Sequence, residues 1–411
     1  MPRLGAIAGL VALAVAACGG AGGTGGGGDG LAVVVSAPVS SQPWIARSIT
    51  QGAKLAVDDV NARGGVVVGR KHEKLRLQVL DNGGSPANAL ADARTAVSEH
   101  ALALLTDGTG AVSVAAVTDP AKLPVFICFD GGANLVDAAQ RPTLFRMAPA
   151  DPIMASRLAD YIANAKPRVA LLTDDSDYGH QGHDALRGAL ARDRIAVVSD
   201  QTVQQRATDV SPQVLAARRA NATLLVVWAG AADVAAVVSG IHTAGWDVPV
   251  ISGQTGEDPL VRQRLVSHPE WLQSLRFVSS RITAEVGPKP FARFRAHYED
   301  ELGAEKVGMK QDGRDVIQPP DWAMYPYDSV NLAVEALDEV KQLGAPLMRV
   351  MNATHVVGAN GDGRGYNATY HEGISPSDMY FAKFRGFTFV PVDDDPLSGS
   401  LPAVPQLAGG G

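Results

Sequence analysis

Cysteine is almost absent from this chain, since only Cys18 and Cys128 occur among its 411 residues. So low a number excludes a disulfide framework as the basis of the fold. Cys128 lies in the apolar stretch PVFICFD, where a cysteine is usually a small buried hydrophobe, and no nearby His or Asn favours a nucleophile. Clusters of Lys and Arg are also missing, and the net charge of −7 argues against nucleic acid or anionic lipid as the main partner.

A membrane-spanning segment is not indicated at the N-terminus. The apolar stretch at residues 4–17 is too short to span a bilayer comfortably, and with Arg3 before it and small residues at its end it has the layout of an export signal. The tetrapeptide VAAC at residues 15–18 resembles a bacterial lipobox, in which the cysteine is acylated. We therefore expect a signal peptide at residues 1–17, lipidation of Cys18 and a location on the outer face of the cell membrane. An ordinary secretion signal with an incidental cysteine is the alternative.

Charged residues are scarce, at 19% against 46% apolar residues, which is typical of a globular chain rather than a disordered one. The Gly-rich residues 18–30 cannot bury a core and suit a flexible tether, and residues 393–411 are interpreted as a disordered tail. The length of 411 residues exceeds what one hydrophobic core usually holds, so two lobes are expected.

Short β-rich runs alternate with amphipathic helical runs from Leu31 onward, and the alternation starts again after FRMAPADP at residues 145–152. This pattern predicts an α/β fold of two doubly wound, parallel-sheet lobes, with a ligand site outside the carboxyl ends of the strands. The predicted strands are LAVVVSAP, LRLQVLDN, ALALLTDG and PVFICFD, then RVALLTDD, IAVVSDQTV, TLLVVWAG and VPVISGQ. Residues 303–322 have mixed polarity and are interpreted as a long surface loop.

An ordered series of motifs then carries a resemblance. The helix from Gly52 to Gly65 follows the pattern G-x-x-L-A-x-x-x-x-N-x-x-G-G, a strand ends at Asp81, and Pro86 opens the next helix. The series continues with KLPVFICFDGGANL, DYG, TAGWDVPVISG and YDSVNLAVEAL. The chain resembles the substrate-binding proteins of bacterial ABC importers for branched-chain amino acids and amides, which have the type I periplasmic binding fold. The resemblance covers nearly all of residues 31–392.

The resemblance implies a topology and a function. Three crossings, near Met147, Arg281 and Asn360, would join lobe one (residues 31–147 and 282–357) to lobe two (residues 148–281 and 358–392). A monomer would capture a small-molecule ligand between the lobes and deliver it to ABC permease subunits, with no cofactor and no catalysis. A sensor lipoprotein of the same fold, coupled to a signalling receptor, is the alternative. A hydrolase built on Asp174, His180 and His183 finds no supporting motif.

In lobe one, the resemblance implies that the ligand's carboxylate is held by backbone N–H groups and hydroxyls of the loops DGTGAVS and DGGANL. Glycines let a backbone approach a small anion, although Gly-rich turns are common to all doubly wound folds. The candidate contacts in these loops are Thr109, Gly110, Ser113, Gly131, Gly132 and Asn134. Trp44 matches an aromatic that packs on the ligand's side chain.

In lobe two, Tyr178 matches the family tyrosine that closes over the ligand, and Trp228 lies near the place of a second tyrosine. His180 and His183 follow at helical spacing, and the start of a helix explains them better than a metal site. Thr255 stands about where amino-acid binders place the carboxylate for the ligand's ammonium, and Glu257 comes two residues later. Either Glu257 reaches the ligand, which is then an amino acid, or the pocket takes an amide, a urea-like molecule or an acid.

Overall fold

A computed structural model describes residues 29–280, 289–374 and 379–392 of the chain. The predicted signal peptide, Cys18, most of the tether, the crossing near Arg281 and the tail lie outside the described residues. None of the helices in the described ranges is both long and apolar enough to cross a bilayer.

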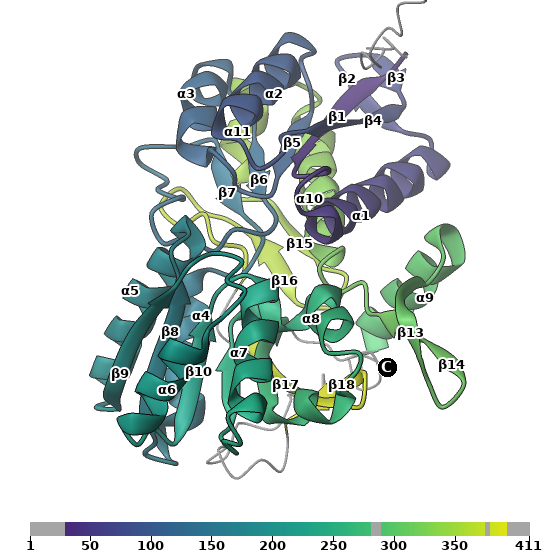
Figure 1. The fold of residues 1–411 in the computed structure, drawn as a ribbon. Helices are drawn as coiled ribbons and strands as arrows, with labels where there is room; N and C mark the ends of the chain where they lie inside the picture. The colour runs from purple at the N-terminus through teal and green to yellow at the C-terminus, as the bar shows by residue number, and fades with distance from the viewer. Residues whose placement is uncertain (1–28, 281–288, 375–378, 393–411) are drawn as a thin grey trace, which may run out of the picture.

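Lobe one is built on a parallel five-stranded sheet, whose strand order is β4-β1-β5-β6-β7 (Figure 1). The strands are β1 (Leu31–Ala37), β4 (Leu75–Asp81), β5 (Ala103–Thr106), β6 (Val125–Ile127) and β7 (Leu144–Arg146). Helices α2 (Pro86–Ser98) and α3 (Ala111–Ala121) pack on one face. Helices α1 (Pro43–Ala62) and α10 (Met324–Val340) pack on the other, beside α11 (Ala345–Met351). Every residue of β1 is buried, as expected for a parallel strand covered on both faces.

Lobe two contains a seven-stranded sheet of order β18-β17-β12-β11-β10-β8-β9. Its parallel strands are β8 (Arg168–Asp174), β9 (Ala196–Val203), β10 (Leu224–Trp228), β11 (Val250–Ser252) and β12 (Leu275–Ser280). Two antiparallel strands, β17 (Met379–Arg385) and β18 (Thr388–Pro391), extend it. Its helices are α4 (Asp151–Ala163), α5 (Asp177–Arg192), α6 (Ser211–Arg219), α7 (Ala231–Thr243) and α8 (Pro259–Arg264). The predicted α/β class and its two doubly wound lobes are confirmed.

The predicted surface loop at residues 303–322 is wrong, because it contains a hairpin that follows α9 (Lys289–Leu302). Strands β13 (Glu305–Gln311) and β14 (Arg314–Gln318) pair antiparallel around Asp312 and Gly313. Both turn residues have positive φ, 51° and 78°, as a two-residue hairpin turn requires. The dipeptide Asp-Gly, flanked by short stretches in which apolar and polar residues alternate, was the sequence signal for this hairpin. Two shorter pairs, β2 (Val66–Val68) with β3 (Lys71–Glu73) and β15 (His355–Val357) with β16 (Gly363–Gly365), were not predicted either.

This hairpin, residues 305–318, touches both lobes, and we call it the interlobe hairpin. Glu305 at its start forms an ion pair of 2.6 Å with Arg47 of α1 in lobe one. Gln263 of α8 donates a hydrogen bond of 3.0 Å to the carbonyl of Val307 from lobe two. The backbone N–H of Phe387 donates to Gln311 at 2.7 Å. Helix α9, which leads into the hairpin, packs on α1 of lobe one. The hairpin is therefore attached to lobe one and lies against lobe two.

The last stretch of lobe one extends further than predicted. Glu372 pairs in parallel with Arg146 of β7, and the Arg146 N–H donates to the His371 carbonyl at 2.9 Å. Tyr366 and His371 are buried, and both rings lie against Phe145, the His371 ring at 4.2 Å. The chain thus remains beside β7 as far as Gly373. It leaves the first sheet after that point and not at the predicted boundary, residue 358.

His371 gives the stability of the fold an expected pH dependence. Burial lowers its pKa, and its Nδ1 lies 2.9 Å from the carbonyl oxygen of Leu144. The unfolded chain takes up this proton near pH 6.5 while the folded chain does not, so the free energy of unfolding should fall as the pH drops below about 6.5. Urea unfolding at pH 7.5 and 5.5 measures this loss, which should be smaller in His371→Gln. An equal loss in the variant would contradict the assignment.

Candidate functional site

The two lobes meet at the loop after β6, residues 128–132, which we call the β6 loop. Groups of lobe two donate hydrogen bonds to its backbone: the Gln254 side chain donates to the carbonyl of Phe129 at 3.4 Å, and the backbone N–H of Asp151 donates to that of Gly131 at 2.7 Å. A Cβ at Gly131 would overlap the Asp151 carboxylate, and one at Gly132 would overlap the side-chain oxygen of Gln181. The glycines predicted to approach a ligand are thus also the residues that allow the lobes to come together here.

Buried polar atoms without a hydrogen-bond partner gather around this loop. Leaving such an atom unpaired costs about 1–3 kcal/mol, so a group of them at a junction between lobes indicates that a ligand supplies the partners. We call these side chains the unpaired polar cluster. Within the described part of the chain its members are Asp151 with both carboxylate oxygens, Gln181 Oε1, Trp228 Nε1 and Gln254 Oε1. The Tyr178 hydroxyl lies beside them, within reach of the Thr255 hydroxyl.

Three aromatic rings of lobe one lie next to the β6 loop and form what we call the aromatic wall. Trp44 comes from the first turn of α1, Phe129 from the β6 loop, and Trp322 from the segment before α10. The ring centroids of Phe129 and Trp322 are 5.1 Å apart, and Trp44 lies 6.2 Å and 6.4 Å from them. Such a surface suits an apolar part of a ligand. Trp44 is itself buried against the other two rings, and its contact with a ligand remains a prediction.

Tyr178 is held at the junction by the start of α5. The Ser176 hydroxyl accepts a hydrogen bond of 3.0 Å from the Gly179 N–H and caps the helix, which places Tyr178 in the first turn. The Tyr178 ring packs on Trp228 at 5.8 Å. Burial, and then the nearby Asp151 charge, raise the pKa of the Tyr178 phenol, which therefore remains a neutral O–H donor.

Trp228, by contrast, is a packing residue with one polar atom in the cluster. It is fully buried at the end of β10, where a Cβ at Gly182 would overlap its ring. Thr255, which stands near Tyr178, donates its own hydroxyl to the carbonyl of Ala229 at 2.7 Å.

The two histidines near Tyr178 have separate surroundings. His180 is exposed, and His183 lies 3.2 Å from Asp184 and 3.2 Å from Asp200. Across residues 29–280, 289–374 and 379–392, no three His, Cys, Asp or Glu side chains are grouped so that they could hold a metal ion. The acidic stretch after β8 is thus a strand-to-helix turn that presents Tyr178.

Four residues predicted from the lobe-one loops do not join the cluster. Thr109 donates its hydroxyl to the Asp107 carboxylate at 2.6 Å. Gly110 has a φ of 66° at the start of α3, and a Cβ there would lie 2.9 Å from Pro86. Ser113 and Asn134 are exposed. Gly110 is therefore required by the backbone turn and by its contact with Pro86.

Glu257 does reach the junction, but its carboxylate is already occupied. It is completely buried and accepts hydrogen bonds of 3.3 Å from Trp322 Nε1 and 3.3 Å from Gln318 Nε2, both in the segment that enters from lobe one. The buried guanidinium of Arg262 lies beside it and donates to the Glu257 carbonyl at 3.4 Å. The Glu257 carboxylate therefore links the two lobes and is not a free acceptor for a ligand's ammonium.

The junction has an acidic character. Burial raises the pKa of Asp107, Asp130 and Asp151, in the last case to about 8 with a further contribution from Asp130. Arg146 opposes this shift, but its guanidinium forms an ion pair of 2.9 Å with Glu372 and donates to the Gly132 carbonyl at 2.9 Å. A positive charge introduced beside Asp151 is therefore favoured, and an isolated negative charge is not.

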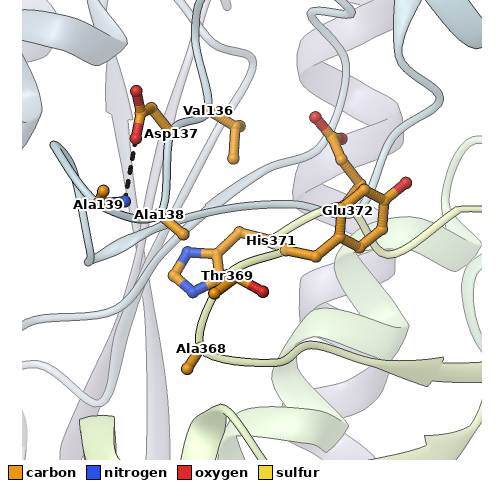
Figure 2. Close-up of a pocket in the computed structure, with 9 residues that line it drawn as sticks. Val136, Asp137, Ala138, Ala139, Ala368, Thr369, His371 and Glu372 are labelled. Atoms are coloured by element: carbon orange, nitrogen blue, oxygen red, sulfur yellow. Dashed lines mark hydrogen bonds between the residues drawn. The ribbon is translucent and has the colours of Figure 1, made fainter.

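A separate surface cavity of about 370 Å³ lies between residues 136–139 and 368–372 (Figure 2). The Asp137 carboxylate accepts the Ala139 N–H at 3.0 Å on one side of it, and His371 and Glu372 line another. No member of the unpaired polar cluster lines this cavity, so the evidence for a ligand site stays with the β6 loop.

Sequence reasoning noted Gln254 beside Thr255 but missed Asp151 and Gln181 of the cluster, together with Phe129 and Trp322 of the aromatic wall. Asp151 is the first residue of α4, where an acid is usually explained by the helix dipole. Its place directly after the crossing from β7 was the signal that pointed to the junction.

Comparisons with known proteins bear on the family and the fold. A family model described as "Periplasmic binding protein" matches residues 30–388. The Leu/Ile/Val-binding protein homolog 3 of Brucella melitensis is 26% identical over 230 residues, which cover 55% of this chain and 60% of that protein. The match thus spans less than two thirds of the curated relative.

Solved structures share the fold over most of the chain. A type 1 periplasmic binding protein from Bordetella pertussis has a TM-score of 0.77 at 17% identity, covering 89% of this chain and 100% of the other. The branched-chain amino acid transporter substrate-binding protein LivJ from Streptococcus pneumoniae, in complex with isoleucine, has a TM-score of 0.73 at 18% identity, covering 88% and 97%.

Proposed function

Because the chain belongs to the periplasmic binding protein family, we propose that it is an extracytoplasmic solute-binding protein. It captures a small polar ligand of the amino acid or amide class between its lobes and delivers it to an ABC permease in the membrane. The observation that carries this proposal is the unpaired polar cluster at the β6 loop, to which lobe two contributes donors and acceptors while lobe one contributes glycines and the aromatic wall.

Binding and lobe closure are linked in this proposal. A ligand that pairs with lobe-two side chains while it packs on the aromatic wall of lobe one stabilises the form in which the lobes touch. Ligand release then requires the lobes to separate. The cycle needs no covalent chemistry, and burial raises the pKa of the Cys128 thiol to about 12, which keeps that group protonated and unreactive.

The ligand class follows from the wall and from the relatives. The aromatic wall suits an aliphatic or aromatic side chain, and the polar cluster beside it suits amine or amide groups. The printed names of the relatives refer to leucine, isoleucine and valine, which supports a ligand of similar size. Lipidation of Cys18, a monomeric state and the permease subunits as partners complete the proposal and rest on the sequence.

A thermal-shift screen tests the proposed function. The mature chain from residue 18, with Cys18→Ser, is heated with amino acids, their amides, aliphatic amines, urea compounds, aliphatic and aromatic acids, and sugars. A ligand present at one hundred times its Kd should add about 2.7 kcal/mol to the free energy of unfolding, which gives a clear rise in Tm. If no compound of the panel raises the Tm, the proposed function fails.

A further inference from the structure

Exposed basic side chains gather at one edge of lobe one, where β1 begins. They come from three segments: the end of α1, the β2–β3 hairpin with the residue after it, and the end of α10. The hairpin turn lies directly against the end of α10, because the Gly69 N–H donates to the Lys341 carbonyl at 2.7 Å. We call this set the basic patch, and its members, all exposed, are Arg63, Arg70, Lys71, Lys74 and Lys341.

The protein itself leaves the basic patch with an excess of positive charge. Among residues 29–280, 289–374 and 379–392, none of its five side chains forms an ion pair. The acidic residues of the same segments are fewer: Glu73, which is half-buried in the hairpin, and Asp338 and Glu339 in the last turn of α10. Arg76 on the neighbouring β4 is paired with Glu99, so these two charges cancel each other.

The prediction from the sequence that Lys and Arg form no cluster is wrong for the folded chain. Three members of the basic patch are near one another in the sequence, whereas Arg63 and Lys341 join them only through the fold. The whole chain has a net charge of −7, so the basic patch is an exception on an acidic protein. An anionic surface therefore attracts this edge and repels the rest of the molecule, which favours one orientation.

The basic patch lies where the predicted lipid anchor joins the folded chain. The Leu31 N–H donates to the Lys74 carbonyl at 2.9 Å, and a Cβ at Gly30 would lie 2.6 Å from the same oxygen. In Figure 1, β1 starts beside β2 and β3 at the top of lobe one. Residues 19–30 separate Leu31 from Cys18, and a Gly-rich chain of this length has an average end-to-end distance of about 20 Å. Lipidation of Cys18 would therefore keep the basic patch close to the membrane.

We propose that the basic patch binds the anionic phospholipid headgroups of the membrane in which Cys18 is anchored. The assignment rests on the lipid anchor of the proposed function and adds a second contact with the membrane. Arg and Lys side chains donate to phosphate oxygens, and the anchor raises the local concentration of lipid, so a few exposed charges are sufficient. The ligand site stays uncovered in this orientation, because the β6 loop lies at the carboxyl ends of the strands and the basic patch at the amino end of β1.

The test uses the mature chain from residue 18, coupled through the Cys18 thiol to a maleimide lipid in vesicles. Cys128 does not compete for the maleimide, because it is buried and burial raises the pKa of its thiol to about 12. One set of vesicles is made of phosphatidylcholine, and a second also contains phosphatidylglycerol. Acetylation followed by peptide mass spectrometry measures how fast the three lysines of the basic patch react. Lys310, which is exposed on the interlobe hairpin, is the internal control.

We expect the three lysines to react at least about threefold more slowly on the vesicles that contain phosphatidylglycerol, because the headgroups cover them. Concentrated NaCl should remove this difference, since salt screens exposed charges. Lys310 should react at the same rate on both sets of vesicles. Equal rates for the patch lysines on both sets would overturn the proposal, and so would a difference that Lys310 shares or that persists in concentrated NaCl.

Charge reversal separates the effect of the basic patch from that of the anchor. Arg70→Glu combined with Lys71→Glu should abolish the protection of the two remaining patch lysines. Lys166→Glu combined with Arg219→Glu is the matched control, because both residues are exposed on lobe two and the net charge changes equally, and it should keep the protection. Thermal unfolding checks that both variants fold, with a Tm close to that of the wild type. Protection retained in the first variant, or lost equally in both, would contradict the assignment.

The membrane contact and solute binding fail separately. The thermal-shift screen uses the unanchored chain, so a screen without a ligand removes solute binding while the acetylation rates still decide the membrane contact. Equal acetylation rates overturn the membrane contact and leave solute binding intact. Mass spectrometry of the protein isolated from its own membrane tests the anchor, and an unmodified Cys18 would overturn the assignment, because the basic patch would no longer be held close to lipid.

Discussion

Leucine in place of Gly132 is expected to weaken ligand binding by roughly a hundredfold, about 3 kcal/mol, while the free energy of unfolding of the ligand-free protein changes by less than about 1 kcal/mol. A Cβ at this position would overlap the Gln181 side chain of lobe two, and the rest of a leucine would extend the clash. The separated lobes can accommodate the larger side chain, so the cost falls on the form in which they touch.

Calorimetric titration with the ligand from the screen measures this effect, and urea unfolding measures the stability of the variant. Ala133→Leu is the matched control, because Ala133 is the next residue of the chain and is exposed. It should bind like the wild type. Unchanged binding by Gly132→Leu would mean that the bound form does not bring the β6 loop against α5.

Methionine in place of Arg262 is expected to lower the free energy of unfolding by about 3–5 kcal/mol. The guanidinium is 0% exposed and donates to Gln318, to the carbonyl of Glu257 and to that of Phe387. Burial lowers its pKa only to about 10, so it is charged at neutral pH and compensates the nearby carboxylates of Glu257 and Asp258. Without it those carboxylates remain buried in a low-dielectric region.

Urea unfolding at neutral pH measures this loss. Arg264→Met serves as the control, since Arg264 lies in the same helix and is exposed, and it should change the free energy of unfolding by less than about 0.5 kcal/mol. If both variants were equally stable, the buried guanidinium would not be the group that stabilises the acidic turn after β11.

The sequence predicted those parts of the fold that depend on local periodicity. Buried parallel strands such as β1 and β10 are continuous apolar runs, and the glycines and Pro86 marked the turns between them. The interlobe hairpin was missed because its strands are mostly polar, and the only hydrophobic side chains buried in it are Val307, Met309 and Val316. The boundary at residue 358 was displaced because pairing of Glu372 with Arg146 joins residues 226 apart in the chain, which no local pattern can reveal.

The candidate site was predicted in part for the same reason. Tyr178 and Gly132 follow strands directly, so the known geometry of parallel sheets places them at the junction between the lobes. Whether a carboxylate has partners depends on distant residues, and for that reason the sequence could not distinguish Glu257 from Asp151. Trp322 donates a hydrogen bond to Glu257, whereas Gly131 packs on Asp151, and both contacts come from the other lobe.

The interlobe hairpin has an optical consequence. Its last residue, Gln318, and the indole of Trp322 four positions later both donate to Glu257 of lobe two. When the lobes separate, Trp322 stays beside Phe129 and Trp44 of lobe one but leaves the Glu257 carboxylate of lobe two, and its indole N–H becomes hydrated. Since indole emission moves to longer wavelength in water, the protein carries an intrinsic fluorophore whose colour reports lobe separation, and the rate of ligand release can be followed without an added dye.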